Sequence, residues 1–449
     1  MKKKTISLLF ALVFLALCLA PSLGLALGHG SGAAANQVLA AKPRLLDREG
    51  RFNPDCLQEL ARYVDDRFAL RQEAVTLWAA LNVQLLRSSV TEDVLYGRDG
   101  WLYFRPTLPD YTRTQPMTQR ELWCAARRLA LLREYAEAQG GRFLFAIAPN
   151  KNSLYPGHMP ALPREALPSN AEALAPLLAK EGVPYVDLFA LFGAQDEELY
   201  YPRDTHWNRR GAALAADAIL EALGRESAYF SGPFAADSHR GDLCEMLFPA
   251  GTQSDPDFRY EPGFTFTASS ENADSITLTT ACENGEGSLL LYRDSFGRAL
   301  YPYLAESFGE ALISRKSGYD PTALAPGGCL VIELVERNLP KLLTEPLTVP
   351  AAERDRSLLS NRFEGLGVSK LVLAKDGPEG YTVLCGDLGG IRPEDDSPVY
   401  VLAGLKLFEA LPGAEDFRLC LPDEVLSDGI LVLFRADGDW VCLEGQTEG

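Results

Sequence analysis

The strongest constraint on the fold is an alternation of apolar strand-like segments with helical segments through the middle of the chain. Residues 142–148 read Arg-Phe-Leu-Phe-Ala-Ile-Ala, a continuous apolar run typical of a strand covered on both faces. The other elements expected in this region are strands near 183–188, 288–291, 312 and 329–334, and helices over 118–139, 170–180, 208–223 and 297–308. Such alternation predicts a parallel sheet between two helical layers, an α/β fold of the three-layer α/β/α type.

The segments on either side of this region show different residue patterns. Residues 54–86 show helical spacing, and a turn at Asp99-Gly100 predicts a hairpin over 96–104. After residue 349, short apolar runs alternate with Asp, Gly and Pro turns, which favours a small β-sandwich. The expected parts are a signal peptide or membrane anchor at 1–27, a stalk and N-terminal helices at 28–89, the α/β domain at 90–348 with an insert at about 244–286, and a β-rich domain, a candidate for carbohydrate binding, at 349–449.

The first residues indicate export. Three lysines precede an apolar run from Ile6 to Ala20, which continues past Pro21 to Leu27. The shorter run makes a helix of roughly 22 Å and the longer one can span a ~30 Å hydrocarbon core. Small residues at 24, 26 and 33–35 offer cleavage sites, so removal and retention are both open. We expect an extracytoplasmic body, secreted or anchored to the outer face of the cytoplasmic membrane, that meets the membrane only through this segment.

Charge and composition exclude several kinds of partner. The chain has 43 basic and 61 acidic residues, a net charge of −18, and a surface of this sign repels nucleic acid. Its nine cysteines and four histidines show no zinc-binding spacing, so we expect no metal and no cofactor. Cys124 and Cys329 are expected to be buried thiols.

Two segments carry the groups that nucleophilic acyl chemistry needs, namely a hydroxyl, a base and an acid that orients the base. His206 lies directly before a predicted helix, and Asp204, two residues earlier, can reach its imidazole. Ser295 lies between a strand and a helix, at the carboxyl edge of the sheet where ligands collect in open α/β folds. A helix N-cap is the alternative for Ser295, but together the two segments favour catalysis.

Other polar and aromatic residues are weaker candidates. His29 lies in the stalk, and His158 and His239 are expected to be solvated. Substrate or oxyanion contacts are expected from cations at strand ends, with surface ion pairs as the alternative: Lys151, Arg315 and Arg337. Arg293 is a further candidate, which would bind an anionic group or narrow the pocket. Sugar stacking is considered for four aromatic residues, with core packing as the alternative: Trp207, Trp101, Tyr200 and Tyr201.

The pair Asp204-Thr-His-Trp207 and Asp294-Ser-Phe296 resembles the SGNH hydrolase-like proteins of the alginate acetylation type (AlgX/AlgJ) and their relatives named for a DHHW motif. In that family the Asp-x-His precedes the serine, a circular permutation of the usual SGNH order, and this chain has the same order. Further matches lie at 96–103, 149–151 and 300–306, so the resemblance covers roughly residues 90–345. Thr205 and Arg293 depart from the pattern, Arg293 replacing the usual Gly of Gly-Asp-Ser.

The resemblance implies a Ser295 nucleophile, a His206 general base and an Asp204 that orients it, on an SGNH hydrolase-like sandwich. It also implies an O-acetyltransferase that receives an acyl group from a membrane-bound O-acyltransferase and places it on a cell-surface or secreted polysaccharide through an acyl-serine intermediate. A carbohydrate acetylesterase with the same triad and a catalytically silent glycan-binding scaffold are the alternatives.

Overall fold

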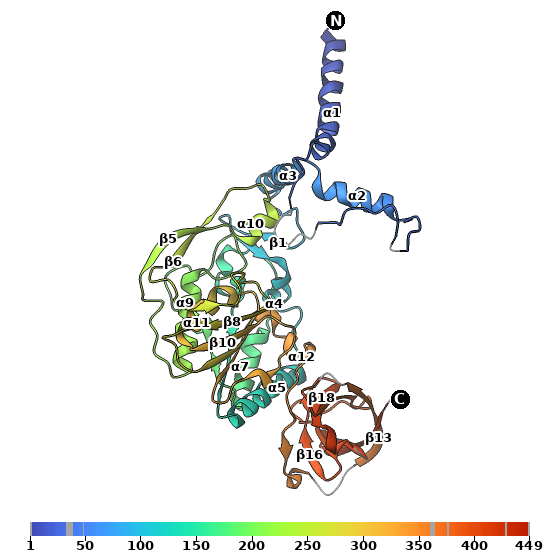
Figure 1. Ribbon diagram of the computed structural model, residues 1–449, viewed down its shortest axis with the longest axis vertical. Helices are drawn as coiled ribbons and strands as arrows, with labels where there is room; N and C mark the ends of the chain where they lie inside the picture. The colour runs from blue at the N-terminus through green and yellow to red at the C-terminus, as the bar shows by residue number, and fades with distance from the viewer. Residues whose placement is uncertain are drawn as a thin grey trace.

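The structure is a computed structural model that describes residues 2–32, 39–47, 49–359, 364–374, 377–426 and 429–447. The expected cleavage region at 33–35 lies outside the described residues. Figure 1 shows an N-terminal helix at one end of the molecule, an α/β body in the middle and a β-rich part at the other end.

A seven-stranded sheet with the order β4-β3-β11-β9-β10-β8-β7 forms the centre of the body. The first five strands of this order run parallel to one another, whereas β8 pairs antiparallel with β10 and β7 pairs antiparallel with β8. The strands are β3 (Arg142–Ala148), β4 (Tyr185–Val186), β7 (Thr267–Ala268), β8 (Thr277–Ala281), β9 (Ser288–Tyr292), β10 (Glu310–Ser314) and β11 (Cys329–Val335). Every residue of the central strand β11 is buried, as its continuous apolar sequence predicts.

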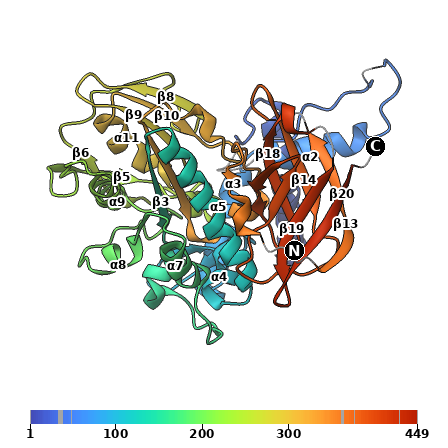
Figure 2. The same ribbon diagram turned by 90° about the horizontal axis from the view of Figure 1, so that it is seen from below.

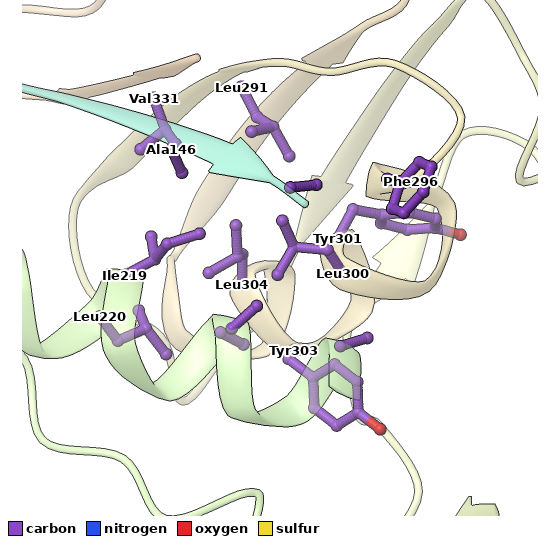
Figure 3. Packing of buried hydrophobic residues seen from close by; sticks show 14 of the residues in the cluster. Ala146, Ile219, Leu220, Leu291, Phe296, Leu300, Tyr301, Tyr303, Leu304 and Val331 are labelled. Carbon is purple, nitrogen blue, oxygen red and sulfur yellow. The ribbon is translucent and has the colours of Figure 1, made fainter. Parts of the chain in front are cut away.

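Helices cover both faces of this sheet. On one face lie α9 (Arg209–Ala222) and α11 (Gly297–Ser307), and on the other α5 (Gln119–Ala138) and α7 (Asn170–Lys180). Figure 3 shows the first of these interfaces, where aliphatic side chains of α9 and α11 pack toward Ala146, Leu291 and Val331 of the strands. The three-layer α/β/α architecture is confirmed.

Within the α/β body the expected elements differ from the structure at the strand after α7 and at the insert. The strand expected at 183–188 is only Tyr185–Val186, because the Asp187 side chain accepts a hydrogen bond from Ala190 N (3.0 Å) and starts α8 (Leu188–Gly193). The insert at about 244–286 is partly built into the body, since its strand β8 pairs with β10. The remaining elements here are the β5 (Phe234–His239) and β6 (Asp255–Tyr260) hairpin, α10 (Asp242–Leu247), and the short helices α4 (Leu108–Thr112), α6 (Lys151–Leu154) and α12 (Lys341–Thr344).

The N-terminal part is helical. The helix α1 (Lys2–Ala26) contains the segment Thr5–Leu25, which is long and apolar enough to cross a membrane. Next come α2 (Cys56–Arg67) and α3 (Arg71–Leu86), then the predicted hairpin of β1 (Val94–Tyr96) and β2 (Leu102–Phe104). Asp99 and Gly100 make its turn with positive φ values of 55° and 81°.

The β-rich part is one curled sheet of nine strands, with the order β12-β16-β15-β19-β20-β13-β14-β18-β17. Pro350, just before β12, forms a β-bridge with Cys420 of β18, and only Ala410 separates β16 from β17 in the chain. The two ends of this order therefore lie together, and the sheet curls into a barrel (Figure 2). One closed sheet therefore takes the place of the two stacked sheets of the expected sandwich. The strands are β12 (Glu353–Arg354), β13 (Glu364–Ala374), β14 (Tyr381–Asp387), β15 (Tyr400–Ala403), β16 (Lys406–Glu409), β17 (Leu411–Pro412), β18 (Asp416–Pro422), β19 (Ile430–Ala436) and β20 (Asp439–Thr447).

The barrel docks on α5 through buried polar contacts. Arg127 pairs with Glu409 (2.6 Å), and the guanidinium of Arg128 donates to Pro412 O (2.7 Å) as well as to Leu343 O (2.8 Å) of the body. Arg120 donates to Ser397 O (2.6 Å). Cys124 on the same helix and Cys329 on β11 are buried thiols, as predicted.

Candidate active site

The loop before α9 and the turn after β9 bring Asp204, His206 and Ser295 together at the carboxyl edge of the sheet. His206 Nε2 lies 2.9 Å from Ser295 Oγ, and His206 Nδ1 lies 2.7 Å from Asp204 Oδ1. With the Nδ1 proton directed to the carboxylate, Nε2 is left to accept the proton of the Ser295 hydroxyl. The arrangement can therefore turn this hydroxyl into a nucleophile.

The turn that carries Ser295 is held by its neighbour, so the serine hydroxyl is not a helix cap. The N-cap position of α11 is Phe296, and no side chain caps it. Asp294 Oδ1 accepts from Phe296 N (2.9 Å), and its Oδ2 accepts from Val335 N and Asn338 Nδ2 (2.8 Å each). The Ser295 hydroxyl is thereby left for His206.

Asp204 is the centre of a wider hydrogen-bond network. Its Oδ1 accepts from His206 N (2.8 Å) as well as Nδ1, and its Oδ2 accepts from His239 Nε2 and Asp242 N (2.8 Å each). Burial opposes ionisation, but the hydrogen bonds from both histidines outweigh it and hold the pKa of the Asp204 carboxyl well below its usual range. Asp204 is therefore an anion that can orient His206.

His239 belongs to this network, so the prediction of a solvated His239 is wrong. Its ring stacks on Tyr201 at 4.2 Å between centroids, while its Nε2 reaches Asp204. His239 ends β5, whose hairpin partner β6 is tied to the Asp204 loop by the ion pair between Asp255 and Arg203 (2.7 Å). The sequence carries no short-range signal for this contact, because the two residues are 35 positions apart and the helix α9 lies between them in the chain.

A glycine lets α10 approach the same loop. A Cβ on Gly241 would lie 2.2 Å from Arg203 O, so only glycine allows this close contact. It places the backbone N of Asp242 on Asp204, and Asp242 Oδ1 accepts from Thr205 N (2.7 Å). Oxygen and nitrogen atoms of Asp204, His206 and Asp242 lie within 4.8 Å of one another, but hydrogen bonds inside the protein account for this cluster.

Lys151 lies beneath the loop, and its predicted contact with a substrate or oxyanion is wrong. The buried ammonium donates to three backbone carbonyls, those of Tyr201 (3.1 Å), Pro202 (3.0 Å) and Asp204 (2.5 Å). Burial lowers the pKa of Lys151 to about 8, against the opposing effect of the Asp204 charge. Lys151 is thus a positioning residue that fixes the shape of the loop.

Trp207 and Arg293 also serve the framework. Trp207 is fully buried and donates from Nε1 to Phe296 O (3.1 Å), so of the two alternatives considered for it the structure favours core packing over sugar stacking. The buried Arg293 guanidinium donates to Asp294 O (3.1 Å) and to Ala273 O, while its stem fills the space beside Gly297. Its Nε is buried and has no hydrogen-bond partner among the described residues, so Arg293 remains a candidate for an anion contact. The other three aromatic candidates, Trp101, Tyr200 and Tyr201, are buried as well.

Two clefts meet at Ser295. The larger, about 800 Å³, includes His206, Tyr301 and Met246 in its lining, and the smaller, about 300 Å³, includes Lys316 and Lys341. Both clefts are lined by Ser295, Arg315 and Arg337.

Arg315 and Arg337 therefore remain candidates for contacts with a bound molecule. Arg337 stacks its guanidinium over the rings of Phe104 (5.3 Å) and Phe296 (5.5 Å), and Arg315 pairs with Asp274 (3.1 Å). Of the strand-end cations proposed from sequence, the structure brings these two to both clefts beside the serine, and Arg293 lines the smaller cleft only.

Comparisons with known proteins agree with this architecture. Residues 94–298 match the family described as "SGNH hydrolase-like domain, acetyltransferase AlgX". A relative described as "Probable alginate O-acetylase AlgJ" from Pseudomonas syringae pv. tomato is 29% identical over 198 residues, covering 41% of this chain and 49% of that protein. A protein of the same description from Pseudomonas fluorescens is 25% identical over 202 residues. The chain thus spans about half the length of the curated relatives it matches.

Solved structures were also found. A DHHW family protein from Eubacterium siraeum has 18% identity and a TM-score of 0.41, over 56% of this chain and 93% of that one. The O-acetyltransferase domain of Pseudomonas putida AlgJ has 19% identity and a TM-score of 0.38, over 60% of this chain and 95% of that one.

Proposed function

We propose that this chain, which carries an SGNH hydrolase-like domain of the AlgX type over residues 94–298, is an O-acyltransferase that esterifies a polysaccharide through an acyl-Ser295 intermediate. The observation that carries the proposal is the complete hydrogen-bonded series from Ser295 to His206 to Asp204, open to two clefts. The relatives described as alginate O-acetylases support acetyl as the acyl group and a polysaccharide as the acceptor.

The reaction has two steps with a single base. His206 Nε2 accepts the Ser295 proton as Oγ attacks the donor carbonyl, and then returns it to the leaving group, which yields the acyl-serine. In the second step His206 takes a proton from a sugar hydroxyl, whose oxygen attacks the ester carbonyl, and returns that proton to Ser295 Oγ as the ester bond to the serine breaks. The backbone N–H of Ser295, for which the described residues provide no acceptor, is placed to bind the oxyanion formed in each step.

Two clefts at one serine suit a transferase, because donor and acceptor can be bound on different sides of the acyl-serine. An esterase needs only water in the second step, and a silent scaffold has no need of an oriented base. The helix α1 supports a body held at the outer face of the cytoplasmic membrane. In that position a membrane-bound O-acyltransferase can serve as the acyl donor.

The test is acetyl transfer from a chromogenic acetyl ester to oligosaccharides by the full chain in detergent. We expect acetylated oligosaccharide in proportion to acceptor concentration, and one acetyl group on Ser295 by mass spectrometry when the acceptor is omitted. His158→Ala changes a partly exposed histidine that pairs with Asp99, outside both clefts, and serves as the control. Free acetate at a rate independent of the sugar would identify an esterase, and absence of both ester turnover and the acyl-serine would overturn both enzymatic readings.

The pH dependence should reflect the His206 imidazole. Burial disfavours its charged form, but the hydrogen bond to Asp204 and the charges of Asp204 and Asp242 outweigh it and raise the His206 pKa above its ordinary 6.5. A protonated His206 cannot accept the serine proton, so kcat/KM falls as the pH drops through this raised pKa. We expect an acid limb with its midpoint above 6.5, measured from pH 4 to 9; a midpoint below 6 would contradict the assignment of the base.

His239→Ala is expected to lower kcat about tenfold, because the activation free energy rises by about the net contribution of one hydrogen bond. The same variant should move the acid limb of the pH profile to higher pH. Without His239, Asp204 Oδ2 keeps only the donor from Asp242 N, so the carboxylate accepts more strongly from His206 and stabilises its imidazolium. His239→Gln retains a neutral donor and should restore most of the rate and the original limb. Identical pH profiles for the alanine variant and the natural protein would show that Oδ2 does not influence His206.

A further inference from the structure

We propose that α3 lies on the lipid surface beside α1, with its exposed apolar face in contact with the bilayer, so that the catalytic body is held against the membrane at a second place. The inference rests on the described N-terminal helices and is independent of the reaction that the body performs.

The apolar face of α3 lacks a partner in the described part of the chain. Leu77, Leu81 and Leu85 are spaced four residues apart, so they follow one another along one side of the helix, and Trp78 lies next to them. Their exposed fractions are 63%, 43%, 77% and 61%. Leu70, directly before the helix, adds to the same side and is 60% exposed. So many large apolar side chains on one helix are more than the scattered exposure of an ordinary soluble surface.

The start of α3 lies beside the last turn of the membrane-crossing segment of α1. Ala69 N donates to Pro21 O (3.1 Å), and a Cβ on Gly24 would lie 2.4 Å from the Ala69 Cβ. Ser31 Oγ, just after α1, donates to Phe68 O (3.0 Å). Since Pro21 and Gly24 lie within Thr5–Leu25, Leu70 is placed at the depth where α1 leaves the hydrocarbon.

The geometry favours lipid as the occupant of this face. Figure 1 shows α3 next to the base of α1, between that helix and the body, which is where a bilayer surface would pass if α1 crosses it. Tryptophan is typical of the membrane–water boundary, as is the exposed Trp78 here. Arg71 at the start of α3 and Arg87 directly after its end can extend their stems along the apolar surface and reach the headgroups.

The opposite side of α3 connects this contact to the catalytic residues. Ala79 and Val83 pack in one apolar cluster with Leu243, Cys244 and Leu247 of α10. Thr76 Oγ1 accepts a hydrogen bond from Ala250 N (2.9 Å) just after α10. The first residue of α10 is Asp242, which donates to the Asp204 carboxylate, and Met246 of α10 lines the larger cleft. The proposed lipid contact is therefore connected to the Asp204 network through α3 and then α10.

The experiment is quenching of Trp78 fluorescence by brominated lipids. The full chain is reconstituted in vesicles of phosphatidylethanolamine and phosphatidylglycerol, with bromine either shallow or deep in one acyl chain. The Trp78 signal is the difference between the natural protein and Trp78→Phe. We expect shallow bromine to quench at least about half of this signal, and more of it than deep bromine does.

Trp440→Phe is the matched control, because Trp440 lies in the barrel at the other end of the molecule. Its difference signal should be equally bright with and without bromine. A Trp78 signal that is no more quenched than that of Trp440 would overturn the proposal, and would favour a protein partner for this face instead, since these vesicles contain no other protein. Emission spectra in detergent, unchanged apart from the missing tryptophan, show that both variants are folded.

Discussion

Ser295→Ala is expected to lower kcat for acetyl-ester turnover by about 10⁴-fold or more and to abolish the acyl-enzyme. In the proposed reaction the hydroxyl is the one group in the series that forms a bond to the acyl carbon, so neither His206 nor the clefts can replace it. Binding of the oligosaccharide should persist, because the clefts keep their other lining residues. Steady-state kinetics and intact-protein mass spectrometry measure the two effects.

The variant should fold like the natural protein. The turn around residue 295 is held by the Asp294 carboxylate and not by the serine side chain. Ser231→Ala, which removes an exposed serine hydroxyl bonded to Ala228 O, is the matched control and should leave turnover unchanged. Turnover that survives in Ser295→Ala would mean that another group, or an activated water, attacks the acyl carbon.

Asp204→Asn is expected to lower kcat by about 10³- to 10⁴-fold and also to destabilise the fold. An amide has one acceptor oxygen, whereas the two Asp204 oxygens accept from four N–H groups, so the amide NH₂ must face two of those donors. If it faces His206, the imidazole loses the orientation that leaves Nε2 free. Leaving buried donors unpaired should reduce the free energy of unfolding by about 3 kcal/mol at pH 7.

The loss of stability should depend on pH. Because the Asp204 pKa is lowered on folding, its contribution is present above the unfolded value of about 3.9 and is lost as the pH falls through the folded value. Denaturant unfolding at pH 7 and at pH 3 should therefore show a smaller difference between the variant and the natural protein at the lower pH. Asp99→Asn, at an exposed carboxylate that pairs with His158, is the control. A stable Asp204→Asn protein with full activity would remove Asp204 from the machinery.

The parts of the site that could be predicted are those whose residues lie close together in the sequence. The Asp-x-His spacing and the strand–serine–helix sequence each fix local geometry, and the parallel sheet brings both to one edge. The partner of the second Asp204 oxygen was not predictable, because His239 reaches it only through the β5–β6 hairpin.

The sequence places both Lys151 and Arg315 at the carboxyl ends of strands, but it does not show which way either side chain points. Lys151 is turned under the loop by three carbonyls, whereas Arg315 lines both clefts. In the C-terminal part, alternating apolar runs identify strands and not the pairing between them, so the closure of the barrel across Ala410 had no signal in the sequence.

Because the barrel docks on α5, this helix packs against both the α/β body and the barrel. Arg128 holds carbonyls of the body and of β17 with one guanidinium, and Leu411 of β17 is buried in the apolar cluster under α5. Truncation after residue 348 would therefore leave Arg127 without Glu409 and open an apolar wall of the catalytic body to water. The C-terminal hundred residues therefore stabilise the α/β body, and the barrel and the body should unfold in one thermal transition.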